Sequence, residues 1–154
     1  MKKICLLAIL LIAFSQQKLS AQALGNTYKT AVGVKFYPLG VSLKTFIRSD
    51  AALDFIGYFY DRGTRITGLY EYHGKITDAG NLKFYIGPGA HVGLYNKNFF
   101  AGGTSVGIDG VVGLDFKFPS LPIDLSIDWQ PSYEFGNYDG FISNSGGIGI
   151  RFTF

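Results

Sequence analysis

The chain has 154 residues, enough for one domain, and it is 47% hydrophobic and 16% aromatic but only 16% charged. It is therefore too apolar to belong to the intrinsically disordered class. Three of its 14 basic residues lie before residue 24; removing them leaves 11 basic against 11 acidic residues, which gives no electrostatic reason to bind nucleic acid.

The first 23 residues have the layout of a secretory signal peptide. Two lysines follow the first methionine, an apolar run occupies 4–14, and small residues end the segment. The run is too short to span a bilayer as a helix, so a retained anchor is the less favoured interpretation. We expect cleavage after Ala23, or alternatively after Ala21. The only cysteine, Cys5, precedes both sites, so the exported chain cannot rely on disulfides.

Residues 24–154 are predicted to form one all-β domain, because apolar and polar residues alternate with period two almost throughout. The predicted strands are 27–37, 41–47, 52–60, 64–74, 82–95, 106–118, 123–135 and 145–154. Gly, Asp, Asn and Pro separate them, with two longer connections at 96–105 and 136–144. Several strands reach the ~9–11 residues that cross a bilayer at a tilt. The spacing favours a meander of hairpins.

Within most predicted strands, the charged side chains share one parity and the large apolar side chains share the other. The polar parity supplies these candidates for an interior network: Arg65, Glu71, His91, Asp109, Asp115, Lys117, Asp124, Asp128, Glu134 and Arg151. The third strand is the exception, since Asp54 shares its face with Ile56, Tyr58 and Tyr60. Alternation alone does not decide which parity faces water, because a soluble sheet packed against a core alternates too.

Four further features favour a polar interior and an apolar exterior. The polar parity is rich in small residues, aromatics gather near strand ends, the strands are long, and the exported chain has no cysteine. Aromatic girdles at both rims are typical of membrane barrels. A charge on the lipid-facing side would cost about 2–4 kcal/mol at the membrane midplane, which explains why the apolar parity has none.

The turn at 119–122 predicts the register of the sixth and seventh strands. It places Lys117 opposite Asp124 and Asp115 opposite Ser126, and both faces then stay consistent along the hairpin. Arg151, on the last strand, is expected near Asp128 or Gln130, depending on how the last loop closes. Proline removes a ladder hydrogen bond, so irregular pairing is expected at Pro88 and Pro131.

These polar residues have two interpretations, a catalytic carboxylate pair or ion path, and a set of mutually neutralising ion pairs. The second is favoured because eight strands leave an interior that side chains fill. A turn near residue 78 would place His73 opposite Lys83 and His91 opposite Arg65, roughly 27 Å apart at ~3.4 Å per residue. The two histidines then cannot share a metal. The sequence also has neither a phosphate-binding loop nor a nucleophile motif, so we expect no cofactor.

The signal peptide, the eight alternating strands and the C-terminal RFTF resemble small outer-membrane β-barrel proteins of the OmpA/OmpX-like type. In that family a last strand that ends in alternating aromatic residues is the signal for the barrel-assembly machinery; Ile150, Phe152 and Phe154 match it. The resemblance implies an eight-stranded antiparallel up-and-down transmembrane barrel in a Gram-negative outer membrane. It would be a monomer in contact with lipid and lipopolysaccharide, with both termini in the periplasm.

The leading hypothesis for function is a non-enzymatic barrel with a structural or surface-interaction role. One alternative is an outer-membrane enzyme that modifies lipid A or phospholipid, which would need a Ser/His/acid set at the membrane boundary. The other is a soluble periplasmic lipocalin-like binder with reversed faces, in which Asp124 and Asp128 would lie in water and the aromatic side chains inside.

Overall fold

Ten β-strands make up the part of the chain that the computed structural model describes, which is residues 27–61, 63–76, 80–95, 103–135 and 140–154. The strands are β1 (Thr30–Phe36), β2 (Gly40–Phe46), β3 (Ala51–Tyr60), β4 (Gly63–Lys75), β5 (Leu82–Tyr95), β6 (Gly103–Lys117), β7 (Ile123–Trp129), β8 (Ser132–Phe135), β9 (Gly140–Ile142) and β10 (Gly146–Thr153). No helix in the described ranges is long and apolar enough to cross a membrane. The predicted signal peptide, 1–23, lies outside these ranges.

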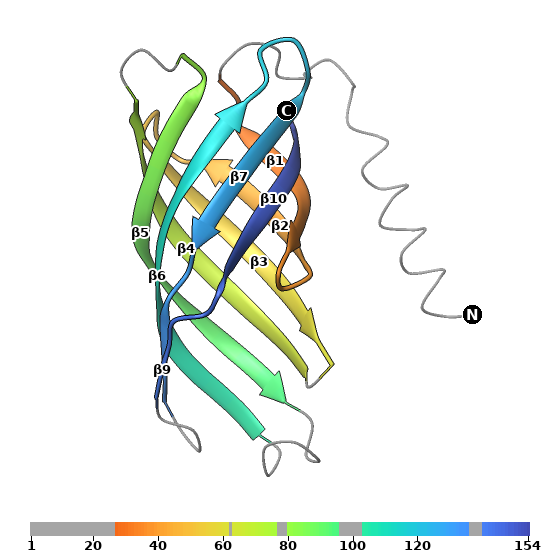
Figure 1. Cartoon of the computed structure of the whole chain (residues 1–154), viewed down its shortest axis with the longest axis vertical. Helices are drawn as coiled ribbons and strands as arrows, with labels where there is room; N and C mark the ends of the chain where they lie inside the picture. The colour runs from red at the N-terminus through yellow and green to blue at the C-terminus, as the bar shows by residue number, and fades with distance from the viewer. Residues whose placement is uncertain (1–26, 62, 77–79, 96–102, 136–139) are drawn as a thin grey trace, which may run out of the picture.

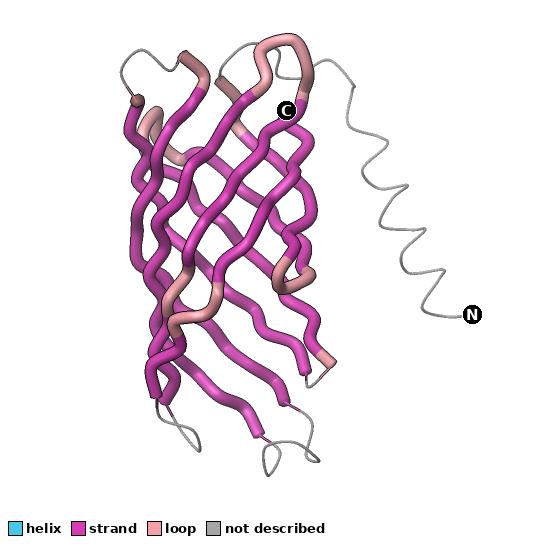
Figure 2. The backbone as a smooth tube through the Cα atoms, viewed as in Figure 1, coloured by secondary structure: helices cyan, strands magenta, loops and turns pink. Residues whose placement is uncertain are grey.

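The strands close into a barrel of eight antiparallel positions (Figures 1 and 2). Each strand from β1 to β6 pairs with the next strand in the chain, and β10 pairs with both β7 and β1, which completes the ring. β8 continues the line of β7, and β9 leads into β10, so these four segments fill two positions of the ring. The predicted all-β class and the eight-stranded antiparallel barrel are confirmed.

The two prolines interrupt the ladders where the sequence predicts it. Pro131 separates β7 from β8, yet β6 keeps the same register on both sides, because Val112 faces Trp129 and Asp109 faces Ser132. At Pro88, the ladder between β4 and β5 has a gap between the pairs at Leu69 and Tyr72. Proline lacks the N–H that a ladder requires, so both gaps follow directly from the residue.

The predicted register of the sixth and seventh strands is confirmed, with Lys117 opposite Asp124 and Asp115 opposite Ser126. The prediction for Arg151 is wrong, because Arg151 faces Asp124 instead of Asp128 or Gln130. The register of Arg151 differs because the last hairpin is longer than predicted. Residues 140–142, predicted as loop, form β9 and extend the ladder with β8, which moves β10 along β7.

The predicted register between the fourth and fifth strands is also wrong, by two residues. His73 faces Tyr85 and His91 faces Thr67, in place of Lys83 and Arg65. β4 runs to Lys75, one residue beyond the predicted end, and closes the hairpin later. A shift of two residues keeps every side chain on its predicted face, since the period of a strand is two.

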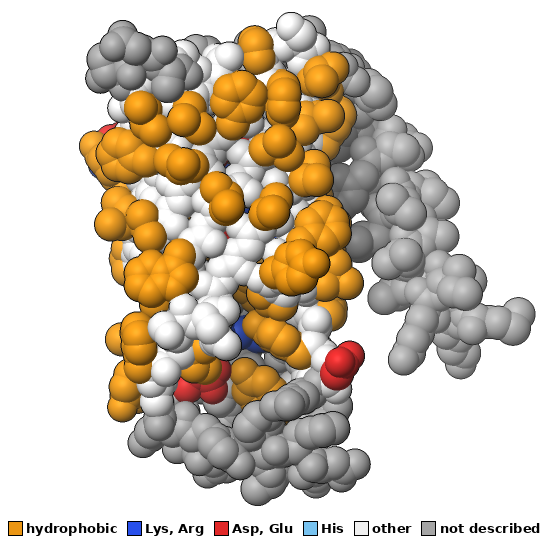
Figure 3. Space-filling model, viewed as in Figure 1, with side chains coloured by type: hydrophobic (Ala, Val, Ile, Leu, Met, Phe, Trp, Pro, Cys, Tyr) orange, Lys and Arg blue, Asp and Glu red, His pale blue; other side chains and the backbone are white. Residues whose placement is uncertain are grey.

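The large apolar side chains cover the outside of the barrel, and the charged ones fill its interior. Ile66, Ile108 and Ile127 each expose more than half of their surface, whereas Asp54, Asp124 and Lys44 expose none. Figure 3 shows hydrophobic side chains over most of the visible barrel wall. The interior is so crowded that a Cβ added at Gly113 would lie 2.7 Å from the Tyr85 hydroxyl. Small residues are therefore required on the polar parity.

We predict that Gly113→Ala lowers the free energy of unfolding by about 1–3 kcal/mol, because the added methyl group overpacks the interior beside Tyr85. Gly57→Ala is the matched control, since its Cβ would lie 3.7 Å from Val41, an ordinary contact. The fluorescence of Trp129, the single tryptophan, reports unfolding in detergent micelles as urea is raised. Equal urea midpoints for the two variants would contradict a crowded interior.

Candidate functional site

All ten residues predicted for the polar interior are buried, with exposed fractions of 8% or less. They come from β4, β5, β6, β7, β8 and β10. They do not form one site. They belong to two clusters, one near the C-terminus and the start of β1 (called the end near the termini below) and one near the opposite end of the barrel, joined by a few contacts in the middle.

Arg151 is the centre of the cluster near the termini. Its guanidinium lies 2.8 Å from Asp54 and 3.4 Å from Asp124, and it donates hydrogen bonds to Ser42 at 2.9 Å and Ser126 at 2.7 Å. The side chains of β2, β3, β7 and β10 therefore meet on one cation. A buried charge needs such partners, because removing it from water costs several kcal/mol that only good pairing offsets.

A second group in the same cluster surrounds Lys44. The Lys44 ammonium lies 2.8 Å from Glu71 and 3.5 Å from Asp115. The ring of His73 lies between the same two carboxylates, with Nε2 3.0 Å from Glu71 and Nδ1 3.8 Å from Asp115. Two carboxylates are thus shared by one ammonium and one imidazole.

Two side chains close this cluster toward the end of the barrel. Tyr28, which precedes β1, donates a hydrogen bond to Asp115 at 3.3 Å. Burial raises the pKa of Tyr28 well above its usual value, and the nearby Asp115 carboxylate raises it further, so the phenol remains a donor. Lys117 faces Asp124 across the ladder, but its ammonium bonds instead to the carbonyl oxygens of Phe118 at 2.7 Å and Leu121 at 2.8 Å.

The middle of the barrel is bridged by Asp128. Lys35 lies 2.7 Å from this carboxylate, and the Tyr85 hydroxyl donates to it at 2.6 Å. Farther along the axis, Tyr58 donates to the Gln130 side chain at 2.7 Å, and Gln130 reaches Asp109 at 3.3 Å.

Asp109 and Glu134 organise the cluster at the opposite end. Asp109 forms a close ion pair with Arg65 and lies 2.8 Å from His91 Nδ1. The other ring nitrogen of His91 lies 3.4 Å from Glu134, which also accepts a hydrogen bond from Tyr95 at 3.2 Å. His91 therefore links the two carboxylates, as His73 does in the first cluster.

The predicted set omitted seven buried polar residues that take part in these contacts: Lys35, Ser42, Lys44, Asp54, His73, Ser126 and Gln130. All of them except Asp54 follow the same parity rule and could have been included on that signal. The inward position of Asp54 could not be predicted from parity because the apolar Ile56 and Tyr58 share its face. In the structure both of these side chains are also buried inside the barrel. An apolar cluster of Ile56, Tyr58, Leu69, Tyr85 and Val111 thus lies within the otherwise polar interior.

The interior supports mutual neutralisation better than catalysis. Each Lys, Arg or His in it makes an ion pair or a hydrogen bond, and the principal groups are almost completely buried. Within the described residues, no group of three His, Cys, Asp or Glu side chains is arranged to hold a metal ion. The polar side chains therefore form a paired network that occupies the interior of the barrel.

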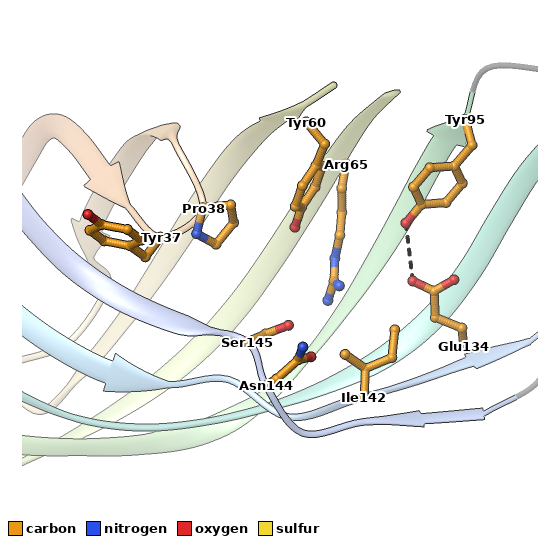
Figure 4. Close-up of a pocket in the computed structure, with 9 residues that line it drawn as sticks. All are labelled: Tyr37, Pro38, Tyr60, Arg65, Tyr95, Glu134, Ile142, Asn144 and Ser145. Carbon is orange, nitrogen blue, oxygen red and sulfur yellow. Dashed lines mark hydrogen bonds between the residues drawn. The ribbon is translucent and has the colours of Figure 1, made fainter. Parts of the chain in front are cut away.

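A pocket of about 520 Å³ lies at the end of the barrel opposite the C-terminus. Its lining residues are Tyr37, Pro38, Tyr60, Arg65, Tyr95, Glu134, Ile142, Asn144 and Ser145. Figure 4 shows Tyr60 and Arg65 side by side, directed toward Asn144 and Ser145, with Tyr37 at one end and the hydrogen-bonded Tyr95 and Glu134 at the other. Sequence reasoning missed this pocket, because it joins turn and linker residues whose meeting depends on strand register.

We predict that Arg151→Met lowers the free energy of unfolding by about 3–5 kcal/mol, because it leaves Asp54 and Asp124 buried without their shared cation. Arg48→Met is the control, since the Arg48 side chain is 68% exposed in its pair with Asp50 and should contribute at most about 1 kcal/mol. Urea unfolding in detergent micelles gives both values. The double change Arg151→Met with Asp54→Asn should recover part of the loss; an additive loss would contradict the pairing.

No protein-family model, no curated protein and no solved structure matches this chain.

Proposed function

We propose that this chain is a non-enzymatic integral outer-membrane protein of a Gram-negative bacterium, with a structural or surface-interaction role and a sealed interior. The observation that carries the proposal is the separation of side chains by the barrel wall. Large apolar side chains point outward from every strand position of the ring, and the buried charges pair with one another inside.

The outer surface suits hydrocarbon and does not suit water. Soluble monomers rarely expose an apolar patch beyond a few hundred Å², whereas this barrel exposes Ile, Val, Leu and Phe side chains along all of its wall. The lipocalin-like alternative required Asp124 and Asp128 in water. Both are buried, and Trp129, on the opposite face of the strand, is 49% exposed, which argues against that alternative.

Aromatic side chains lie near both ends of the wall, as expected for interfacial girdles. Near the termini, Phe152 packs against Phe154 with ring centroids 5.1 Å apart. Near the opposite end, Tyr133 packs against Phe135 at 5.2 Å. The resemblance stated above places the termini in the periplasm, so the end with the pocket would face outward.

The last strand supports assembly in an outer membrane. Ile150, Phe152 and Phe154 alternate on the outer face of the C-terminal strand and its end, where a receptor could read them. We propose that the barrel-assembly machinery recognises these residues. The closed ring of strands needs no second copy, which supports a monomer surrounded by lipid and lipopolysaccharide.

The interior supports a sealed, non-enzymatic barrel. Both histidines lie between pairs of carboxylates inside the barrel, away from the lipid boundary where a lipid-modifying enzyme would hold its catalytic set. The ion pairs along the axis are buried, which supports the proposal that the interior is sealed.

We expect the chain to remain in the membrane pellet after sodium carbonate extraction, because its apolar wall is held by lipid. Unheated samples should migrate differently from boiled samples on SDS gels, since a closed barrel resists the detergent. A soluble fraction containing the chain would refute the membrane proposal. Steady ion conductance across a planar bilayer would refute the sealed interior.

We predict that Ile127→Arg destabilises the barrel in lipid by about 2–4 kcal/mol, because the new charge would face hydrocarbon near the middle of β7. Ile127 is 56% exposed on the outer face. Leu121→Arg is the control, since Leu121 is similarly exposed but lies in the turn beyond the strand ends. Urea titration in lipid vesicles, read by the heat-resistant fraction on gels, compares them. Equal effects would place Ile127 in water.

A further inference from the structure

The pocket exists because the barrel wall is lower on one side. The turn between β1 and β2 ends early, and the last ladder contact above it joins Phe59 N to Leu39 O at 2.8 Å. Figure 1 shows this turn stopping well short of the ends of β3, β4, β5 and β6. On the other flank, β9 pairs only with β8 among the described strands. The pocket lies at this low side of the wall, where Tyr60 at the end of β3 and Ile142 of β9 both line it.

The full charges at the base of the pocket are already paired. Arg65 is bound to Asp109, and Glu134 is bound to His91 and Tyr95. An anion that bound Arg65, or a cation that bound Glu134, would have to compete with these internal partners. Both charged groups are therefore already held by internal partners, which favours a neutral ligand over a charged one.

The remaining lining combines aromatic rings with neutral polar groups. Tyr37 is 84% exposed and Tyr60 is 36% exposed, so both offer ring faces to a ligand. The Asn144 amide and the Ser145 hydroxyl, on the opposite wall, supply both donors and acceptors (Figure 4). A sugar ring matches this arrangement, because its C–H faces stack on aromatic rings while its hydroxyl edges donate and accept hydrogen bonds.

We propose that this pocket binds a neutral saccharide of one or two rings, either free or as the headgroup of a glycolipid. A volume of about 520 Å³ lies within the usual ~300–1,000 Å³ of small-molecule sites. This proposal names a ligand class for the surface-interaction role proposed above. It rests on the proposed membrane location only in the choice between a free sugar and a glycolipid headgroup.

The test uses the full exported chain, purified in lauryldimethylamine oxide micelles, with the amide and tyrosine ring signals followed by NMR. The free probes are maltose, lactose and diacetylchitobiose, and the membrane probe is dodecyl maltoside in mixed micelles. We expect at least one neutral sugar to shift signals at Tyr37, Tyr60, Asn144 and Ser145 with a saturating curve and a dissociation constant near ~1 mM or lower. Saturation with dodecyl maltoside alone would identify a lipid headgroup as the source, and saturation with a free sugar would identify a soluble ligand.

The pocket variants are compared with a neighbour on the other face of the same strand. Tyr60→Ala should weaken binding about three- to tenfold, through loss of a stacking ring. Phe59→Ala should change it by less than about twofold, because Phe59 points outward. Asn144→Ala, at an exposed residue outside the ladders, should also weaken binding and keeps the test valid if Tyr60→Ala fails to fold.

The proposal is overturned if no neutral probe gives saturable shifts at the pocket, or if Phe59→Ala and Tyr60→Ala weaken binding equally. It is also overturned if inorganic phosphate or choline shifts the same signals as strongly as the sugars do. Carbonate extraction and heat-modified mobility are read on the same samples. A chain that behaves as a membrane barrel but binds no sugar therefore refutes this inference alone.

Discussion

The constraint on which the whole structure depends is the burial of charge in a cylinder only eight strands wide. Such a ring leaves an interior that side chains fill, so every charge placed there must meet an opposite charge or a hydrogen-bond partner. The described interior contains seven carboxylates, five lysine or arginine side chains and two histidines. Because each histidine lies between two carboxylates, the acidic excess is shared among donors from several strands. The ion pairs thus join strands that the ladders alone would join only to their neighbours.

This constraint also explains the residues that carry no charge. A long inward side chain such as that of Arg151 or Tyr85 needs bare positions beside it on the barrel wall. Gly113 is the ladder partner of Tyr85 on the next strand, and Gly149, two residues before Arg151 on β10, lies close to the Arg151 guanidinium. At these two positions glycine leaves room for a large polar neighbour on the same part of the wall.

The sequence predicts the faces of the barrel better than it predicts contacts across it. Period-two parity needs only the local chain, so residues from Arg65 to Glu134 were assigned to the correct side even where the register was two residues off. The hairpin at 119–122 was right in register because two prolines and a short turn leave little choice. The partner of Arg151 was wrong because it depends on how far the last hairpin extends. Asp54 was not predicted from parity because the other inward-facing side chains of its strand are apolar. The packed interior explains this mixed face, since it holds an apolar cluster beside the charged groups.

The same division between wall, interior and rim limits where a function can reside. The outer wall carries large apolar side chains, and the charged groups of the interior already pair with one another. Neither region can therefore bind a polar ligand without a large loss of stability. At the rim, the side chains are held by neither of these requirements. There the β1–β2 hairpin is short, so the wall beside it is lower, and Tyr60 and the base of the pocket are uncovered. Recognition by this barrel is therefore expected at its open end, where the hairpin length, set by Tyr37–Leu39, shapes the site while the paired network below holds the strands in place.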